Sequence, residues 1–125
     1  MKRKVFYTLY TKDGYPRAVE KQGWEIKVGD VKVHVYENYK IYVIDPATGM
    51  MLLCIEPNSI KKCLTDVEIR DLVMAESNKI SNMLSTVMVS EKYRDFVKMY
   101  NYLSRGQKMY EKVRGSFSVE GTVQD

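Results

Sequence analysis

The sequence contains little histidine and little cysteine, with one His and two Cys among 125 residues. A tetrahedral zinc site takes four nitrogen, sulfur or oxygen ligands, so His34, Cys54 and Cys63 cannot form an ordinary Cys/His site alone. Two cysteines are also far fewer than a disulfide-stabilised scaffold contains. We therefore expect separate reduced thiols, no structural metal and a cytoplasmic location.

Long apolar runs and glycine-rich loops are absent as well. No apolar run reaches the roughly 18 residues of a transmembrane helix, and the N-terminal MKRKVFYTLYTKDG lacks the apolar segment of a signal peptide. The glycines of the first half, such as Gly14, Gly29 and Gly49, stand alone in turn-like stretches, so neither a Walker nor a dinucleotide-binding motif is present. We expect no cofactor and no membrane partner.

The overall composition is that of an ordinary globular protein, with 45% apolar and 29% charged residues. The net charge of +4 is unevenly distributed. Residues 1–62 hold 11 Lys/Arg against 7 Asp/Glu, whereas residues 63–125 hold 9 of each. The basic excess therefore lies in the first half, which permits contact with a polyanion without requiring it.

The stretch WEIKVGDVKVHVY, residues 24–36, alternates apolar and polar residues on both sides of Gly29-Asp30. This pattern predicts a hairpin with a two-residue loop, in which Val28 pairs with Val31 and all apolar side chains share one face. If the loop after Tyr36 has an odd number of residues, the apolar side chains of the next strand lie on the same face. The predicted apolar face consists of Trp24, Ile26, Val28, Val31, Val33, Val35, Ile41, Val43, Met51 and Leu53.

Further strands flank this hairpin. Residues 5–11 are rich in β-branched and aromatic residues and predict a first strand, whereas residues 17–23 show no clear pattern. The segment 45–49, DPATG, has the proline and glycine of a turn, with Gly49 in the left-handed conformation. The apolar segment 50–55 then predicts a strand that needs cover on both sides.

Two helices are expected in the second half. Thr65 and Glu68 have the spacing of a capping box, and an apolar stripe continues to Val87 along about six turns. Ser90 is placed to cap a second helix that ends at Gly106. The expected fold is α+β, an antiparallel meander of four or more strands packed on one face against two antiparallel helices. One domain spans 1–106, strand-rich over 1–56 and helical over 65–105, and residues 107–125 form a partly ordered tail.

The polar face of the predicted sheet is the first candidate site. Lysines and tyrosines alternate there around a single histidine, a composition suited to stacking bases and binding phosphates. Lys27 stands opposite Lys32, and a bound anion would reduce the repulsion between these two like charges. The candidate binding residues are Lys27, Lys32, His34, Tyr36, Lys40 and Tyr42.

Farther along the sheet, the same face becomes apolar. A five-residue loop over 45–49 places Ile44, Met50, Leu52 and Cys54 together as an apolar strip. Contiguous exposed apolar patches mark interaction sites, so the strip is a candidate interface with a second copy or another protein. The first strand, residues 17–23 or the tail could instead cover it.

Catalysis has one weak candidate. His34 faces Glu25 across the hairpin, an arrangement that favours the charged imidazolium, but no nucleophile is placed beside the pair. The carboxylates of Asp66, Glu68 and Asp71 fall in the first turns of a helix, where the helix dipole explains them.

Three functions follow from these patterns. The first is a small, non-catalytic, oligomeric binding protein that occupies a macromolecular partner or an anionic ligand, as an accessory or inhibitor protein of a mobile element would. The second is a nucleic-acid or nucleotide binder that uses the Lys and Tyr face. The third is an enzyme based on His34 and Glu25, which we rank last.

Overall fold

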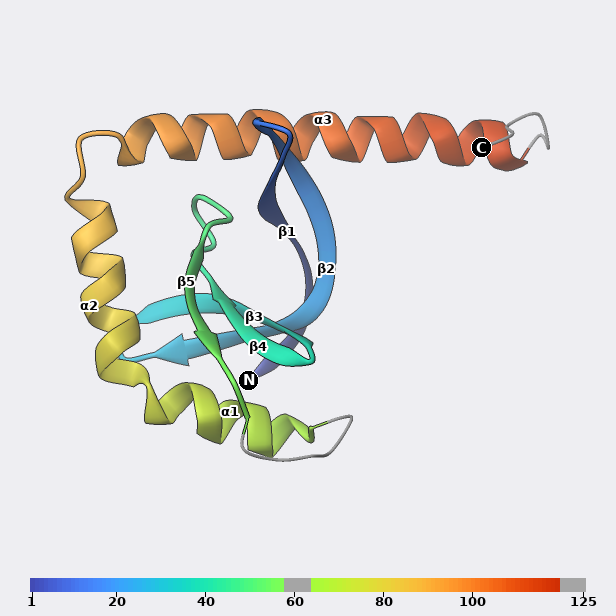
Figure 1. Cartoon of the computed structure of the whole chain (residues 1–125). Coiled ribbons are helices and arrows are strands. Elements are labelled where there is room, and N and C mark those ends of the chain that lie inside the picture. Colours follow the sequence, from blue (N-terminus) through green and yellow to red (C-terminus); the bar gives the residue numbers. More distant parts are fainter. Residues whose placement is uncertain (58–63, 120–125) are drawn as a thin grey trace.

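A computed structural model describes residues 1–57 and 64–119, with side chains up to residue 109. Figure 1 shows a curved antiparallel sheet with helices along three of its sides. The strands are β1 (Lys2–Lys12), β2 (Tyr15–Val28), β3 (Val31–Asn38), β4 (Lys40–Ile44) and β5 (Met51–Ile55). The helices are α1 (Asp66–Ala75), α2 (Ser77–Met88) and α3 (Tyr93–Val119). The predicted α+β class and the meander are confirmed.

The five strands lie in the order β1-β2-β3-β4-β5, so each strand pairs with its neighbour in the sequence. The register of the β2–β3 hairpin is the predicted one, with Val28 opposite Val31 and Trp24 opposite Val35. Its turn has Gly29 at φ 62°. A positive φ at the first loop position is available to glycine at no steric cost, which explains the residue found there.

The β3–β4 connection also has the predicted parity, because Val35 pairs with Val43 and both lie in the core. The β4–β5 register differs from the prediction by a bulge at Val43/Ile44. This irregularity turns Leu52 into the core and leaves Met51 56% exposed. The placement of Met51 on the apolar face was therefore wrong, since a bulge shifts one strand past its partner by a residue.

Residues 17–23, which the sequence left unassigned, belong to β2. β1 pairs with β2 from Lys2↔Glu25 to Lys12↔Tyr15. Residues 5–22 of these two strands extend beyond the β2–β3 hairpin, and we call them the β1–β2 ribbon. The ribbon curves away from the rest of the sheet toward α3 (Figure 1). Gly23 lies at the start of this curve, where a Cβ atom would overlap the carbonyl oxygen of Val35.

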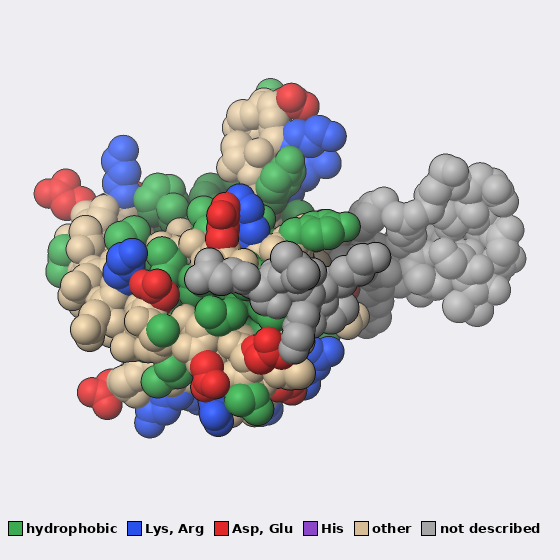
Figure 2. All heavy atoms as spheres, turned by 60° about the horizontal axis from the view of Figure 1, so that its bottom comes forward, with side chains coloured by type: hydrophobic (Ala, Val, Ile, Leu, Met, Phe, Trp, Pro, Cys, Tyr) green, Lys and Arg blue, Asp and Glu red, His purple; other side chains and the backbone are tan. Residues whose placement is uncertain are grey.

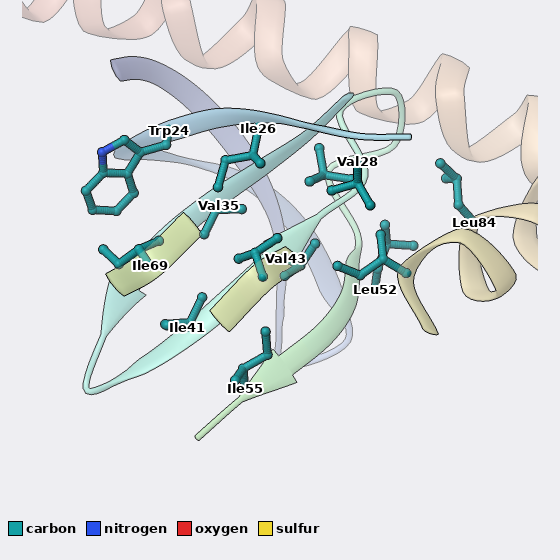
Figure 3. Close-up of a cluster of buried hydrophobic side chains, with 13 residues drawn as sticks. Trp24, Ile26, Val28, Val35, Ile41, Val43, Leu52, Ile55, Ile69 and Leu84 are labelled. Atoms are coloured by element: carbon teal, nitrogen blue, oxygen red, sulfur yellow. The ribbon is translucent and has the colours of Figure 1, made fainter. Parts of the chain in front are cut away.

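The main core lies between one face of β2–β5 and helices α1 and α2 (Figure 3). α1 begins with the predicted capping box, since the backbone N–H of Glu68 donates to Thr65 Oγ1 and that of Thr65 donates to Glu68 Oε1. The indole of Trp24 donates to Asp66 Oδ1 at 3.2 Å and ties the helix start to the sheet. The buried core residues are Trp24, Ile26, Val28, Val33, Val35, Ile41, Val43, Leu52, Ile55, Ile69, Val73, Ile80 and Leu84.

The helical half differs from the prediction in three respects. The expected six-turn helix is divided at Glu76, which ends α1 with φ −103° and ψ 18°. Ser90 lies three residues before α3, outside the helix, and its carbonyl oxygen accepts from Tyr93 N. α3 continues past Gly106 to Val119, so the predicted end at Gly106 was wrong. A glycine stops a helix only where it takes a left-handed conformation, and Gly106 is not among the residues with positive φ.

The two edges of the curved sheet meet at one point. The backbone N–H of Leu9 on β1 donates to the carbonyl oxygen of Gly49 in the β4–β5 loop at 2.8 Å. That loop is held by the buried carboxylate of Asp45, which accepts from Thr48 Oγ1 at 2.8 Å and from Tyr93 Oη at 2.9 Å. Burial, together with the hydrogen bond to Asp45, raises the pKa of Tyr93 to about 12. The loop thus joins both sheet edges and the start of α3.

Candidate functional site: the concave cleft

The curvature of the sheet turns the predicted polar face inward. β1 residues at alternate positions, among them Phe6 and Thr8, lie on the same side of the sheet as His34 and Ile44, and all four are buried. The ring of Phe6 stacks on the imidazole of His34 with the centroids 4.5 Å apart. The inward side, which we call the concave face, is therefore partly filled by the β1–β2 ribbon.

His34 does not lie on a solvated face, as the sequence predicted, but is only 7% exposed. Its Nδ1 is the buried side-chain atom without a hydrogen-bond partner in the described part of the chain. The predicted cross-strand pair with Glu25 is present, with Nε2 3.9 Å from Oε1. Because the imidazole is buried, a polyanion in solution cannot reach it, and His34 is not a binding residue of an exposed face.

The charge state of His34 also differs from the prediction. Burial lowers the pKa of His34 below its ordinary value, Lys4 lowers it further, and Glu25 and Asp45 oppose the change. Glu25 itself is bound by Lys4 at 3.2 Å, and this hydrogen bond is the main reason why the pKa of Glu25 is lowered. A carboxylate already neutralised by an ammonium does less to stabilise an imidazolium, so the neutral histidine prevails.

Beside the buried part, the concave face opens into a cleft of about 490 Å³. Its wall on one side is the ribbon, and on the other side β3, β4 and the start of β5. A volume of this size is typical of small-molecule sites, which are mainly apolar with a few polar groups. The cleft is lined by Thr8, Leu9, Tyr10, Val19, Lys21, Tyr36, Asn38, Tyr42, Ile44 and Met51.

A stacked pair of tyrosines forms one wall of this cleft. The rings of Tyr36 and Tyr42 lie 4.9 Å apart with 15° between their planes, because the two residues are direct cross-strand partners. The ammonium of Lys21 lies 4.9 Å from the centroid of the Tyr36 ring. Partial burial raises the pKa of Tyr36, with a smaller contribution from Tyr42, so its hydroxyl stays protonated at neutral pH.

Two of the six candidate binding residues, Tyr36 and Tyr42, thus reach the cleft. Sequence reasoning missed Lys21, Tyr10 and Asn38. Lys21 and Tyr10 come from the ribbon. The alternation of residues along β1 could have placed Tyr10 on this face, and pairing residues 17–23 with β1 could have placed Lys21 there.

The three candidate lysines are exposed but do not line the cleft. Lys27 and Lys32 are direct cross-strand partners, as predicted, at the end of the sheet nearest the β2–β3 turn. Lys40 pairs with Glu56 at 2.9 Å, which neutralises its charge locally. The single Lys and Tyr surface expected from the sequence is therefore divided into separate places.

The predicted apolar strip is not a continuous exposed surface. Ile44 is 3% and Leu52 5% exposed, Met50 is 37% exposed and Cys54 is half-buried beside Tyr42. The ribbon covers part of the strip and the β5 bulge turns Leu52 to the opposite face. Self-association of the protein stays a prediction, but this strip no longer supports it. On the face that carries α1, Figure 2 shows hydrophobic side chains interspersed with charged ones.

No group of three or more His, Cys, Asp or Glu side chains that could hold a metal ion occurs in residues 1–57 and 64–109. Cys54 is a free thiol, and Cys63 lies outside the described residues. Within the described helices, none combines the length and apolar character needed to cross a bilayer.

Comparison with known proteins finds no matching family model, no similar curated protein and no similar solved structure.

Proposed function

We propose that the chain is a non-catalytic binding protein and that the concave cleft holds an anionic ligand with a flat ring. The stacked Tyr36–Tyr42 pair beside the ammonium of Lys21 carries this proposal. Flat rings gain most from offset stacking on aromatic side chains, and a lysine supplies a point charge for a phosphate or sulfonate. Asn38 adds an amide that can donate or accept a hydrogen bond at the cleft wall.

The electrostatics of the cleft favour an anion. Among the described residues that line the cleft, Lys21 is the one charged side chain and none is a carboxylate. The apolar side chains of Val19, Ile44 and Met51 line the same cleft as the ammonium. A charge interacts more strongly with an ion of opposite sign in such surroundings than at an open surface.

Binding explains the cleft better than catalysis. In the part of the chain that the structure describes, its lining includes no histidine, carboxylate or thiol that could act as a general base or nucleophile near neutral pH. His34, the side chain suited to proton transfer, is stacked beneath Phe6 and is not among the lining residues. As part of the same proposal we place the protein in the cytoplasm, where a free thiol such as Cys54 stays reduced.

The test uses two phosphates with flat rings, adenosine 5′-monophosphate and 1-naphthyl phosphate, and their neutral counterparts adenosine and 1-naphthol. We expect at least one phosphate to bind by calorimetry, and more tightly than its neutral counterpart. Lys21→Met should weaken phosphate binding about 10- to 150-fold, the value of a hydrogen bond to a charged group. It should leave the neutral compound nearly unaffected.

Lys32→Met is the matched control, because Lys32 is exposed on the same face but outside the cleft. Its phosphate affinity should equal that of the original chain. Failure of both phosphates to bind, or equal losses from Lys21→Met and Lys32→Met, would refute a ligand site in the cleft.

A further inference from the structure

A second and larger hollow lies on the other side of the ribbon, between its tip and α3. Figure 1 shows the ribbon rising to the middle of α3. The hollow has a volume of about 720 Å³ and is open along its length. We call it the α3 groove; its lining consists of Pro16, Arg17, Ala18, Lys98, Asn101, Tyr102, Leu103, Arg105, Gly106, Gln107 and Met109.

The charged side chains among the described residues of the α3 groove are of one sign. Arg17 comes from the ribbon and Lys98 and Arg105 from α3, all three are exposed, and no carboxylate is among the described lining residues. None of the three forms an ion pair with another described residue. Cations on both walls and no acid between them attract an anion that is longer than a single phosphate.

The spacing along α3 extends this charge. At 100° per residue, Arg94, Lys98, Arg105 and Lys108 fall within an arc of about 80°. With a rise of 1.5 Å per residue, Lys98 and Arg105 are separated by roughly 10 Å along the helix. Asp95 is the sole acid among α3 residues 93–109 and falls outside that arc. The helix therefore presents more than one cation on this side, although the ammonium of Lys108 lies 5.6 Å from the centroid of the Tyr7 ring on the ribbon.

Between the cations lie aromatic and apolar side chains. Tyr102 is 79% exposed and Met109 69% exposed, and both line the groove with the half-buried Leu103. Asn101 and Gln107 add amide groups to the same lining. An exposed tyrosine between basic side chains can stack with a base while the neighbouring cations meet the phosphates.

We propose that the α3 groove binds single-stranded nucleic acid. The groove combines the two features such sites use, a positively charged channel that follows the backbone and an aromatic platform for the bases. A duplex would offer only its phosphates to Tyr102, since its bases are stacked and paired. This site is separate from the concave cleft and does not depend on the function proposed for that cleft.

A membrane surface fits the same charges less well. A helix that lies in a bilayer interface buries its apolar face in the lipid. In α3 that face is already used, because Tyr100 and Leu103 pack against Tyr7 and Ala18 of the ribbon. The hydroxyl of Tyr100 also donates to the carbonyl oxygen of Tyr7 at 2.7 Å. Among the described side chains of α3, Lys98, Tyr102 and Arg105 stay exposed along the groove, where a partner can meet them.

The test measures the fluorescence anisotropy of a labelled oligothymidine of about a dozen nucleotides, enough to pass the groove. With three phosphate contacts, the slope of log K against log salt should be about −2, so a fourfold rise in salt should weaken binding about 20-fold. The double variant Lys98→Gln/Arg105→Gln should reduce that slope to about −0.7. Tyr102→Ala should weaken binding about 5- to 150-fold through lost stacking.

Lys27→Gln is the control for charge, since Lys27 is exposed on the sheet away from α3, and it should change neither affinity nor slope. Lys21→Met should also leave the oligonucleotide affinity unchanged, which separates this site from the cleft. Unchanged affinity after Tyr102→Ala would overturn the single-strand assignment. Equal competition by polyglutamate or by vesicles of phosphatidylserine would overturn it as well and assign the groove to an acidic protein or a membrane.

Discussion

The part of the sheet beneath α1 and α2 and the part formed by the β1–β2 ribbon are held in place by different forces. The first buries thirteen hydrophobic residues in one continuous cluster. Among the described residues, the second buries Tyr7 and Ala18 against Tyr100 of α3 and stacks Phe6 on His34, and it adds hydrogen bonds such as the one from Tyr100 to Tyr7. Apolar burial is proportional to area and tolerates small shifts, whereas a few hydrogen bonds depend on a fixed geometry.

This difference matters for function, because both proposed sites lie along the ribbon. The concave cleft uses one face of the ribbon and the α3 groove uses its tip and α3. A region held by few buried contacts opens more easily than a large core. Both proposed sites therefore border the part of the molecule that has the smaller buried cluster.

The largest effect should come from Gly23, where the ribbon leaves the rest of the sheet. In Gly23→Ala the new Cβ would overlap the Val35 carbonyl oxygen, and the clash involves backbone that cannot move without breaking the β2–β3 ladder. We expect the free energy of unfolding to fall by at least about 3 kcal/mol. Urea unfolding, monitored by the fluorescence of Trp24, measures it.

Gly106→Ala is the matched control, because a Cβ there meets nothing within 4 Å and the residue lies inside α3. It should stabilise the protein by about 0.5–1 kcal/mol, since alanine loses less backbone entropy in a helix. A Gly23→Ala variant as stable as the original chain would show that the bend does not require glycine.

An intermediate effect is expected at Tyr93, which joins α3 to the β4–β5 loop. Tyr93→Phe removes the hydrogen bond to the buried carboxylate of Asp45 and should cost about 1.5–3 kcal/mol. Hydrogen exchange should show faster opening in α3 and the ribbon than in α1 and α2. Tyr15→Phe, at a residue 72% exposed, is the control and should change neither quantity. Uniform acceleration across the whole chain would mean that the two parts open together.

The smallest effect concerns the contact between the ribbon and the sheet at His34. The pKa of His34 is lowered by burial in the folded protein, from an ordinary value of 6.5. As pH falls below 6.5, the unfolded chain therefore binds a proton more readily than the folded one, and the free energy of unfolding decreases. Above 6.5 this contribution is constant.

His34→Phe keeps a ring against Phe6 and removes the titrating group. Its free energy of unfolding should change less than that of the original chain between about pH 7.5 and about pH 5.5. The pKa of Glu25 is lowered from 4.5, so the stability it contributes is lost only below that range of pH. An identical pH dependence in both chains would contradict a neutral, buried His34.

The sequence was sufficient for the part of the fold that buries a regular apolar pattern. The alternation in residues 24–36 predicted the β2–β3 register, and the capping box predicted the start of α1. The first strand of the ribbon was predicted over residues 5–11, but its second strand was not, because Arg17, Glu20 and Gln22 interrupt any apolar alternation. The break at Glu76 and the bulge at Ile44 were also missed, since both depend on packing against other elements.

The candidate sites show the same limit. Tyr36 and Tyr42 could be placed on one face from the sequence, because a loop of odd length joins their strands, although their direct pairing was not predicted. Lys21 was not added to them, because residues 17–23 show no clear strand pattern and the β1–β2 register is needed to place it on the same face. The close approaches at Gly23 and Gly49 also join distant segments, and such contacts leave no periodic signal in the chain.

Curling of the sheet also affects how the protein behaves when it is concentrated. A flat sheet leaves two rows of unpaired backbone groups at its edges, and these can template pairing between molecules and lead to aggregation. Here the N–H of Leu9 on one edge is already bonded to Gly49 near the other. β5 offers only five residues, and β1 begins with Lys2, Arg3 and Lys4, whose charges repel a second copy. The same bend that forms the cleft thus keeps the strands of one molecule from pairing with those of another.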